Sequence, residues 1–194
     1  LSKICKMCKE FKIMKKVLIL HGWGGSDEPH WQWWLAGQLK EKNYEVSFPS
    51  FPNQDFPNFD EWMKTLEEEY NKFQPDIVVC HSLANILWFH FAAKNELKEL
   101  DKLMLVAPVR KTCDIEEIKT FFPYPIPTQL NAKEIIMVGS TNDPYLNVDE
   151  AIELHAELNV GLKILDDAGH INAESGFGEL SCAVDWIERA CEEV

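Results

Sequence analysis

Short apolar runs alternate with longer segments of helical periodicity from Val17 to the end of the chain. The runs predict six strands, each of four or five residues. Most are apolar throughout, which is typical of strands that are covered on both faces of a parallel sheet. The predicted strands are Val17–Leu20, Glu45–Phe48, Ile77–Cys80, Leu103–Ala107, Glu134–Val138 and Leu162–Leu165.

The segments between these runs carry apolar residues three and four positions apart, which predicts amphipathic helices that pack on the sheet. Helices are expected over Trp31–Lys42, Phe59–Phe73, Leu83–Lys94, Val148–Leu158 and Leu180–Ile187. Alternating strands and helices indicate right-handed βαβ units. The predicted fold class is therefore α/β: a three-layer α/β/α arrangement around a doubly wound, mostly parallel sheet of about six strands.

A chain of 194 residues is long enough for one substantial core and short for two. We expect a single domain over residues 16–194. Residues 1–15 are expected to form an N-terminal tail, disordered or foreign to the natural protein, because their basic, broken pattern resembles neither a strand nor a leader peptide.

The formal net charge of −13 opposes binding to nucleic acid or to an anionic membrane surface, since such contacts need clustered lysine and arginine. No apolar run approaches the roughly 20 residues of a membrane span. We therefore expect a cytoplasmic protein with neither nucleic acid nor membrane as a partner.

The six cysteines are scattered over strands, helices and loops, which is not the pattern of a disulfide framework. Only Cys5 and Cys8 have the spacing of metal ligands. A tetrahedral zinc site needs two more ligands, and no second pair exists. A reduced tail is the favoured interpretation, and no metal site is predicted.

The end of the third predicted strand carries the first chemical signal. Cys80-His81-Ser82-Leu83-Ala84 joins that strand directly to a helix, with Ser82 at the apex of the turn. A nucleophile elbow usually reads G-x-S-x-G, because the residues two positions either side must be small. Cys80 and Ala84 are small, so the steric demand is nearly met. A structural serine is the alternative when this motif is taken alone.

An acid and a base then follow in the order that an α/β-hydrolase requires. Asp143 follows the fifth strand and precedes Pro144, which disfavours a helical conformation at Asp143. His170 follows the sixth strand in Gly169-His170-Ile171-Asn172. Because the carboxyl ends of parallel strands meet at one edge, we expect Ser82, Asp143 and His170 to form a catalytic triad.

None of the other histidines follows a strand that comes after Asp143 in the chain. Of the other acids, Asp149 is expected in the first turn of a helix, and Asp166 and Asp167 stand too close to His170 in sequence to orient it. They are interpreted as structural residues. This group comprises His21, His81, His90, His155, Asp149, Asp166 and Asp167.

A glycine-rich turn, His21-Gly22-Trp23-Gly24-Gly25, follows the first strand. Its glycines do not complete the G-x-G-x-x-G pattern of a dinucleotide site, so no cofactor is predicted. The turn can instead aim an amide at the site. The backbone N–H groups of Trp23 and Leu83 are the predicted oxyanion hole.

At this point the chain resembles the family of small, lidless α/β-hydrolases typified by retinoblastoma-binding protein nine. The resemblance covers almost everything after Lys16 and is carried by the stretches at residues 21–25, 30–35, 80–84, 142–145 and 169–178. It implies a serine hydrolase whose triad is Ser82, Asp143 and His170. The chain departs from the family at Cys80 and Ala84, in place of elbow glycines, and at Leu180, where many members carry tryptophan.

These observations predict a hydrolase that cleaves small ester, thioester or amide substrates through an acyl-enzyme on Ser82, without metal or organic cofactor. Aromatic segments after the second and fourth strands suggest a shallow apolar pocket. Its expected residues are His21, Phe51, Phe122 and Tyr145. The partner would be a small-molecule or short peptide acyl substrate. Two alternatives stay open: a peptidase or amidase that uses the same triad, and a protein-binding module with little turnover.

Overall fold

The computed structural model describes residues 14–189. Six strands form one sheet in the order β2-β1-β3-β4-β5-β6, and every neighbouring pair is parallel. The predicted α/β fold class is therefore confirmed. The strands are β1 (Lys16–Leu20), β2 (Glu45–Ser47), β3 (Ile77–His81), β4 (Leu100–Val106), β5 (Ala132–Ser140) and β6 (Gly161–Leu165).

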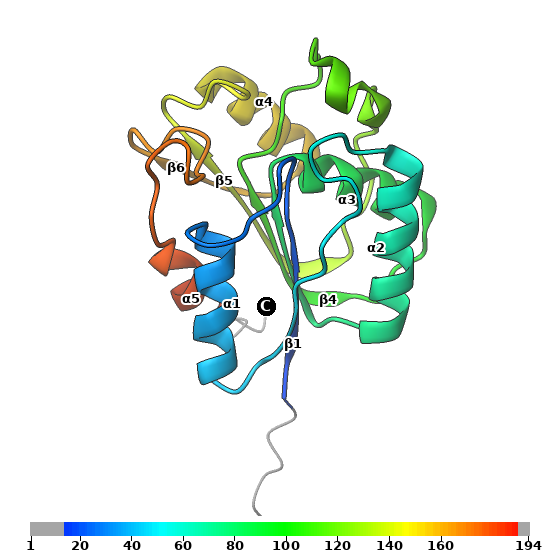
Figure 1. The fold of residues 1–194 in the computed structure, drawn as a ribbon, viewed down its shortest axis with the longest axis vertical. Helices are drawn as coiled ribbons and strands as arrows, with labels where there is room; N and C mark the ends of the chain where they lie inside the picture. Colours follow the sequence, from blue (N-terminus) through cyan, green and yellow to red (C-terminus); the bar gives the residue numbers. More distant parts are fainter. Residues whose placement is uncertain (1–13, 190–194) are drawn as a thin grey trace, which may run out of the picture.

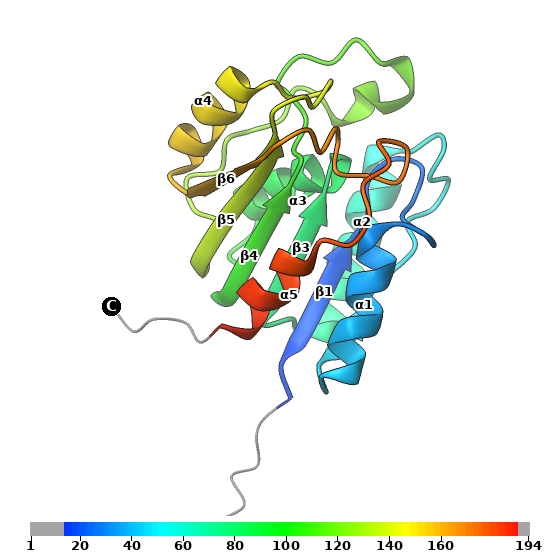
Figure 2. The same ribbon diagram turned by 90° about the vertical axis from the view of Figure 1, so that its left-hand side faces the viewer.

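Helices cover both faces of the sheet (Figures 1 and 2). Each face of the sheet carries its own hydrophobic core. Helices α1 and α5 pack on one face, and α2, α3 and α4 pack on the other. A short 3₁₀ helix, η1, lies in the connection between β4 and β5. The helices are α1 (Trp31–Glu41), α2 (Phe59–Phe73), α3 (Leu83–Lys94), α4 (Val148–Leu158), α5 (Ser181–Glu188) and η1 (Glu116–Phe121).

The centre of the sheet explains the apolar runs of the sequence. Val79 of β3 pairs with Ile19 of β1 on one side and with Met104 of β4 on the other. All five residues of β3 are buried, because helices lie on both faces. Helix α3 is apolar around almost its whole circumference, since it is itself buried between the sheet and the chain that follows β4.

β4 begins at Leu100, three residues before the predicted start. The sequence pattern did not predict a strand at residues 100–102, because Asp101 and Lys102 are polar. Lys102 nevertheless pairs with Ile77 and Glu134 in the ladder, and its side chain is fully buried. Its ammonium donates hydrogen bonds to the carbonyls of Trp186, Ile187 and Arg189 at the end of α5.

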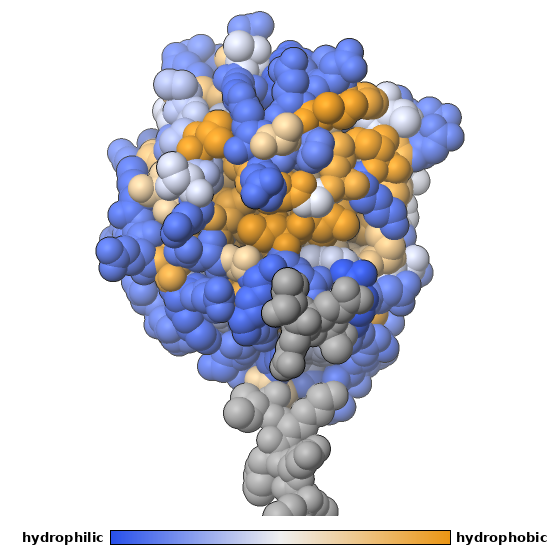
Figure 3. Space-filling model, turned by 180° about the vertical axis from the view of Figure 1, so that it is seen from behind, coloured by the Kyte–Doolittle hydropathy of each residue, from blue (hydrophilic) through white to orange (hydrophobic). Residues whose placement is uncertain are grey.

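The carboxyl ends of all six strands lie at one edge of the sheet (Figure 2). The strand order reverses between β1 and β3, which places the loops after these two strands at the usual binding position of a doubly wound sheet. Seen from behind, apolar side chains gather on the side of the molecule that carries the β6 edge (Figure 3). Ile136, Leu162 and Ile164 of β5 and β6 are only partly buried there.

Within residues 14–189, no helix is long and apolar enough to cross a membrane. Cys5 and Cys8, and all but the last two residues of the expected tail, lie outside the described residues. Of those two, Lys15 forms an ion pair with Asp101, 3.2 Å between Nζ and Oδ2.

Candidate active site

Ser82 stands at the turn between β3 and α3 in a backbone conformation that few side chains adopt, with φ of 53° and ψ of −123°. A serine that precedes a helix commonly caps it through its hydroxyl. Here the Ser82 side chain makes no such bond to α3. The turn is held instead through its backbone, because the Ser82 N–H donates to the Val106 carbonyl at 3.0 Å. The hydroxyl is therefore available for another partner.

The strained turn fits because its neighbours are small. Cys80 and Ala84, which replace the usual glycines, are both fully buried. Burial raises the pKa of the Cys80 thiol well above its ordinary value, so this cysteine is a packing residue. The closest approach comes from Gly22, where an added Cβ would lie 2.7 Å from the Ser82 Cβ. The glycine after β1 is thus required by contact with the serine after β3.

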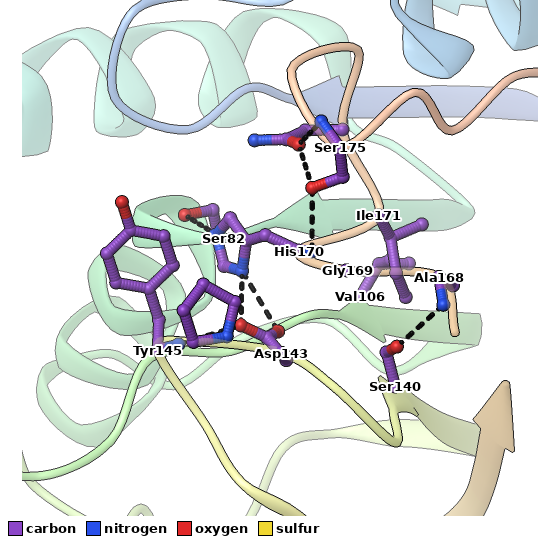
Figure 4. Close-up of polar contacts among 12 residues, drawn as sticks. Ser82, Val106, Ser140, Asp143, Tyr145, Ala168, Gly169, His170, Ile171 and Ser175 are labelled. Carbon is purple, nitrogen blue, oxygen red and sulfur yellow. Dashed lines mark hydrogen bonds and ion pairs between the residues drawn. The ribbon is translucent and has the colours of Figure 1, made fainter. Parts of the chain in front are cut away.

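That partner of Ser82 is His170. Nε2 of His170 lies 2.8 Å from the Ser82 Oγ, and Nδ1 lies 3.0 and 2.9 Å from the two Asp143 carboxylate oxygens. Figure 4 shows Ser82 and Asp143 at opposite sides of the imidazole ring. All three side chains are buried. The structure thus brings together the three residues that the sequence singled out.

The hydrogen-bond partners also fix the tautomer of the neutral imidazole. A carboxylate only accepts, so Nδ1 carries the proton and donates it to Asp143. Nε2 is then the acceptor for the Ser82 hydroxyl. The Asp143 carboxylate is itself oriented by the Tyr145 N–H, which donates to Oδ1 at 2.8 Å. This is the arrangement in which a serine can lose its proton to a histidine.

The loop that carries His170 is held by side chains that the sequence analysis did not assign a role. The Ser175 Oγ accepts from the His170 N–H at 3.0 Å and donates to the Asn172 Oδ1 at 2.7 Å. The Asn142 Oδ1 accepts from the Gly169 N–H at 2.6 Å. Asn142 and Asn172 lie one and two residues from a triad member, which is the only signal that the sequence offered.

Asn85, also missed, braces the serine turn from the first turn of α3. Its Nδ2 donates to the carbonyl oxygens of Ser82 at 2.9 Å and of Val106 at 2.8 Å. Asn85 is fully buried, and these two bonds satisfy its Nδ2, whereas its Oδ1 has no hydrogen-bond partner among the described residues. A polar residue three positions after Ser82, in an otherwise apolar helix, was the available signal.

The loop after β1 brings the Trp23 amide to the same site. The Gly24 N–H donates to Gln54 O at 2.9 Å and the Trp23 indole donates to Asp55 O at 2.9 Å, which tie this loop to the loop before α2. Among the described residues, no backbone carbonyl accepts a hydrogen bond from the amide of Trp23 or of Leu83. Both donors remain available for an oxygen of a ligand.

A cavity of about 660 Å³ opens beside the Ser82 hydroxyl. One part of its wall is apolar and includes Leu83, Val109, Ile115, Ile118 and Tyr145. The Tyr145 ring lies edge-on to the His170 ring, 4.6 Å between centroids. The remaining wall is polar and comes mainly from residues 23–30 and 172–174.

Of the four expected pocket residues, only Tyr145 lines this cavity. His21 is turned into the core: its Nε2 accepts from the Phe51 N–H at 2.8 Å, and its Nδ1 lies 2.7 Å from the Gly22 carbonyl. Phe51 stacks on Trp62 with 4.5 Å between ring centroids. Phe122 packs against Tyr124. These three residues therefore lie outside the cavity: His21 is hydrogen-bonded to backbone groups, and the two phenylalanine rings pack against other aromatic rings.

His81 contacts two other histidines, His30 and His170. The His81 ring is 4.9 Å from that of His30 and 5.3 Å from that of His170, and its Nε2 lies 3.1 Å from the His170 carbonyl. Burial, aided by the neighbouring histidines, lowers the pKa of His30 to about 4 and that of His81 well below its ordinary value. Both are neutral at pH 7.

The other histidines set aside from catalysis have backbone contacts of their own. The His90 Nε2 lies 3.0 Å from the Phe121 carbonyl, and the His155 Nδ1 lies 3.2 Å from the Val160 carbonyl. Across residues 14–189, no group of three or more histidine, cysteine or acidic side chains is placed to hold a metal ion.

The chain is similar to known proteins over most of its length. The family model described as "Serine hydrolase" matches residues 17–189. The YdeN protein of Bacillus subtilis (strain 168) is 24% identical over 179 residues, which cover 89% of this chain and 94% of YdeN.

Solved structures share the fold. The crystal structure of the B. subtilis ydeN gene product superposes with a TM-score of 0.81 at 23% identity, covering 90% of this chain and 97% of that one. The esterase domain of a Rhodothermus marinus protein has a TM-score of 0.59 at 14% identity, covering 86% and 83%. A Pyrococcus furiosus esterase has a TM-score of 0.57 at 17% identity, covering 92% and 84%. Because the family model spans nearly the whole described chain, this protein belongs to the serine hydrolase family.

Proposed function

We propose that this protein is a carboxylesterase-like serine hydrolase that cleaves small acyl substrates through an acyl-enzyme on Ser82. The observation that carries the proposal is the continuous hydrogen-bonded chain from the Ser82 hydroxyl through His170 to the Asp143 carboxylate. The resemblance in fold to two esterases is consistent with it.

In the first half of the reaction, the Ser82 Oγ attacks the acyl carbon while its proton passes to the His170 Nε2. Asp143 stabilises the resulting imidazolium through the Nδ1 proton. The carbonyl oxygen becomes an oxyanion, which the amides of Trp23 and Leu83 stabilise. Each such donor contributes about 3 kcal/mol in a preorganised site. His170 then gives the proton to the leaving group as its bond to the acyl carbon breaks.

In the second half, a water molecule attacks the acyl-enzyme while His170 accepts its proton. The carboxylic acid leaves, and the proton returns to the Ser82 Oγ. The chemistry requires neither a metal ion nor an organic cofactor. An amide substrate would use the same steps with an amine as leaving group, so substrate choice rests on the cavity.

Hydrolysis of short p-nitrophenyl esters, compared between the natural protein and Ser82→Ala, tests this function. We expect turnover that disappears in Ser82→Ala, because the nucleophile is then missing. Ser47→Ala is the control, since Ser47 lies in β2, outside the cavity, and its hydroxyl donates to Glu69 rather than to any residue of the site. Equal turnover in Ser82→Ala and the natural protein would exclude Ser82 as nucleophile. No turnover of any ester or amide by the folded protein would favour the protein-binding alternative.

A further inference from the structure

The polar wall of the cavity beside Ser82 is strongly acidic. Four carboxylate residues line it: Asp27, Glu28, Asp55 and Glu174. No lysine or arginine is among the lining residues. Within residues 14–189, none of the four acids takes part in an ion pair. The negative charge at the cavity is therefore not compensated by a neighbouring cation.

The histidines that share this wall do not supply the missing positive charge. His30 and His81 both line the cavity, and burial keeps their pKa values far below neutrality. At pH 7 they are neutral imidazoles. The lining therefore favours a cation and disfavours an anion by charge alone.

One buried side chain in the same wall, His30, keeps a polar atom without a protein partner. His30 is 6% exposed and accepts the Gln32 N–H at its Nδ1, so the proton of the neutral ring lies on Nε2. No hydrogen bond within residues 14–189 engages that Nε2. A buried polar atom without a partner is expected to find one in a ligand or in water.

We propose that this cavity selects acyl substrates that carry a positively charged ammonium group, with the four exposed carboxylates of its wall attracting the cation and the His30 Nε2 donating to a polar atom of the substrate. The apolar wall formed by Val109, Ile115 and Ile118 then accommodates the uncharged part of the molecule. This inference rests on the proposed hydrolase function and names its substrate class.

Matched pairs of esters that differ only in charge provide the test. Butyrylcholine and 3,3-dimethylbutyl butyrate place a cation or its neutral isostere in the alcohol part. The p-nitrophenyl esters of 4-(trimethylammonio)butyrate and 5,5-dimethylhexanoate do the same in the acyl part. We expect kcat/KM to favour the cationic member of at least one pair by about tenfold, since carboxylates in the cavity wall attract the cation and do not attract its neutral isostere. The pair that shows the preference identifies the side of the scissile bond that carries the charge.

Variants separate the cavity from the overall acidity of the protein. Asp27→Asn/Glu174→Gln removes two charges from the cavity wall and is expected to lower the cation preference at least threefold. Glu96→Gln/Glu99→Gln removes two charges from exposed positions that do not line the cavity and is expected to leave it unchanged. Equal loss of preference in both variants would assign the effect to net charge and overturn the proposal.

The outcomes also distinguish this inference from the proposed function. Ser82-dependent hydrolysis of the neutral esters without any preference for the cationic ones would overturn the substrate class and leave the hydrolase function in place. Failure to hydrolyse any of these four esters would overturn the substrate class, and the proposed function would fall with it only if Ser82-dependent hydrolysis of short p-nitrophenyl esters were also absent.

Discussion

Gly22 and Ser82 lie so close that a Cβ on residue 22 would meet the Ser82 Cβ at 2.7 Å. The loop after β1 therefore packs directly against the turn after β3. We expect this contact to fix the distance between the Ser82 hydroxyl and His170. We expect Gly22→Ala to displace Ser82 and to lower kcat/KM about a hundredfold, the usual cost of moving a reacting atom by about 1 Å.

Gly37→Ala is the matched control for that substitution. Gly37 lies in helix α1, and an added Cβ would meet no atom within 4 Å. It should leave activity unchanged and raise the free energy of unfolding by about 0.5–1 kcal/mol, because alanine is the better helix former. Normal ester turnover by Gly22→Ala would show that the contact does not position the serine.

The Ser175 hydroxyl is expected to act by holding the His170 loop. Ser175→Ala removes the acceptor of the His170 N–H and the donor to Asn172. Because Ser175 is exposed, the fold should survive the change. We expect kcat to fall about ten- to a hundredfold with little change in KM, as measured by steady-state ester hydrolysis. A change confined to KM would instead place Ser175 in substrate binding.

Lys102 is expected to anchor helix α5. Lys102→Met keeps the aliphatic stem but leaves the carbonyls of Trp186, Ile187 and Arg189 without this donor. Such groups cost about 1–3 kcal/mol each when buried and unpaired, so urea denaturation should show a loss of at least 2 kcal/mol. The exposed ion pair of Lys98 with Asp76 offers the comparison, and Lys98→Met should cost less than about 1 kcal/mol. Equal effects of the two substitutions would contradict the anchoring role.

The buried His30 predicts a loss of stability in acid. Its pKa is about 4 in the folded protein and about 6.5 when unfolded. As the pH falls from 6.5 to 4, the unfolded chain therefore binds a proton that the folded protein does not, and the free energy of unfolding decreases. The full effect of this residue is about 3 kcal/mol. Urea denaturation at pH 7, 6 and 5 should show a shallower pH dependence for His30→Gln than for the natural protein; identical slopes would refute the assignment.

The sequence allowed the sheet and the triad positions to be predicted because both depend on strand ends. Parallel strands covered on both faces are apolar runs, and the residues that follow them meet at one edge whatever their separation in the chain. Ser82, Asp143 and His170 could therefore be grouped across 88 residues.

The cavity residues could not be predicted in the same way. His21 and Phe51 follow strands just as Ser82 does, but they satisfy one another and turn into the core. Nothing in their local sequence distinguishes an aromatic residue that lines a cavity from one that packs beneath it. The buried Lys102 was hidden for a related reason, since its partners lie more than 80 residues away at the end of α5.

Covalent labelling with a fluorophosphonate, followed by peptide mass spectrometry, tests the central claim most directly. The reagent reacts with a serine only where a base activates its hydroxyl. The account predicts one adduct on the peptide that carries Ser82, absent in Ser82→Ala and strongly slowed in His170→Ala. An unlabelled Ser82 in the folded protein, or equal labelling in all three proteins, would contradict the claim that Ser82, His170 and Asp143 act together as a catalytic triad.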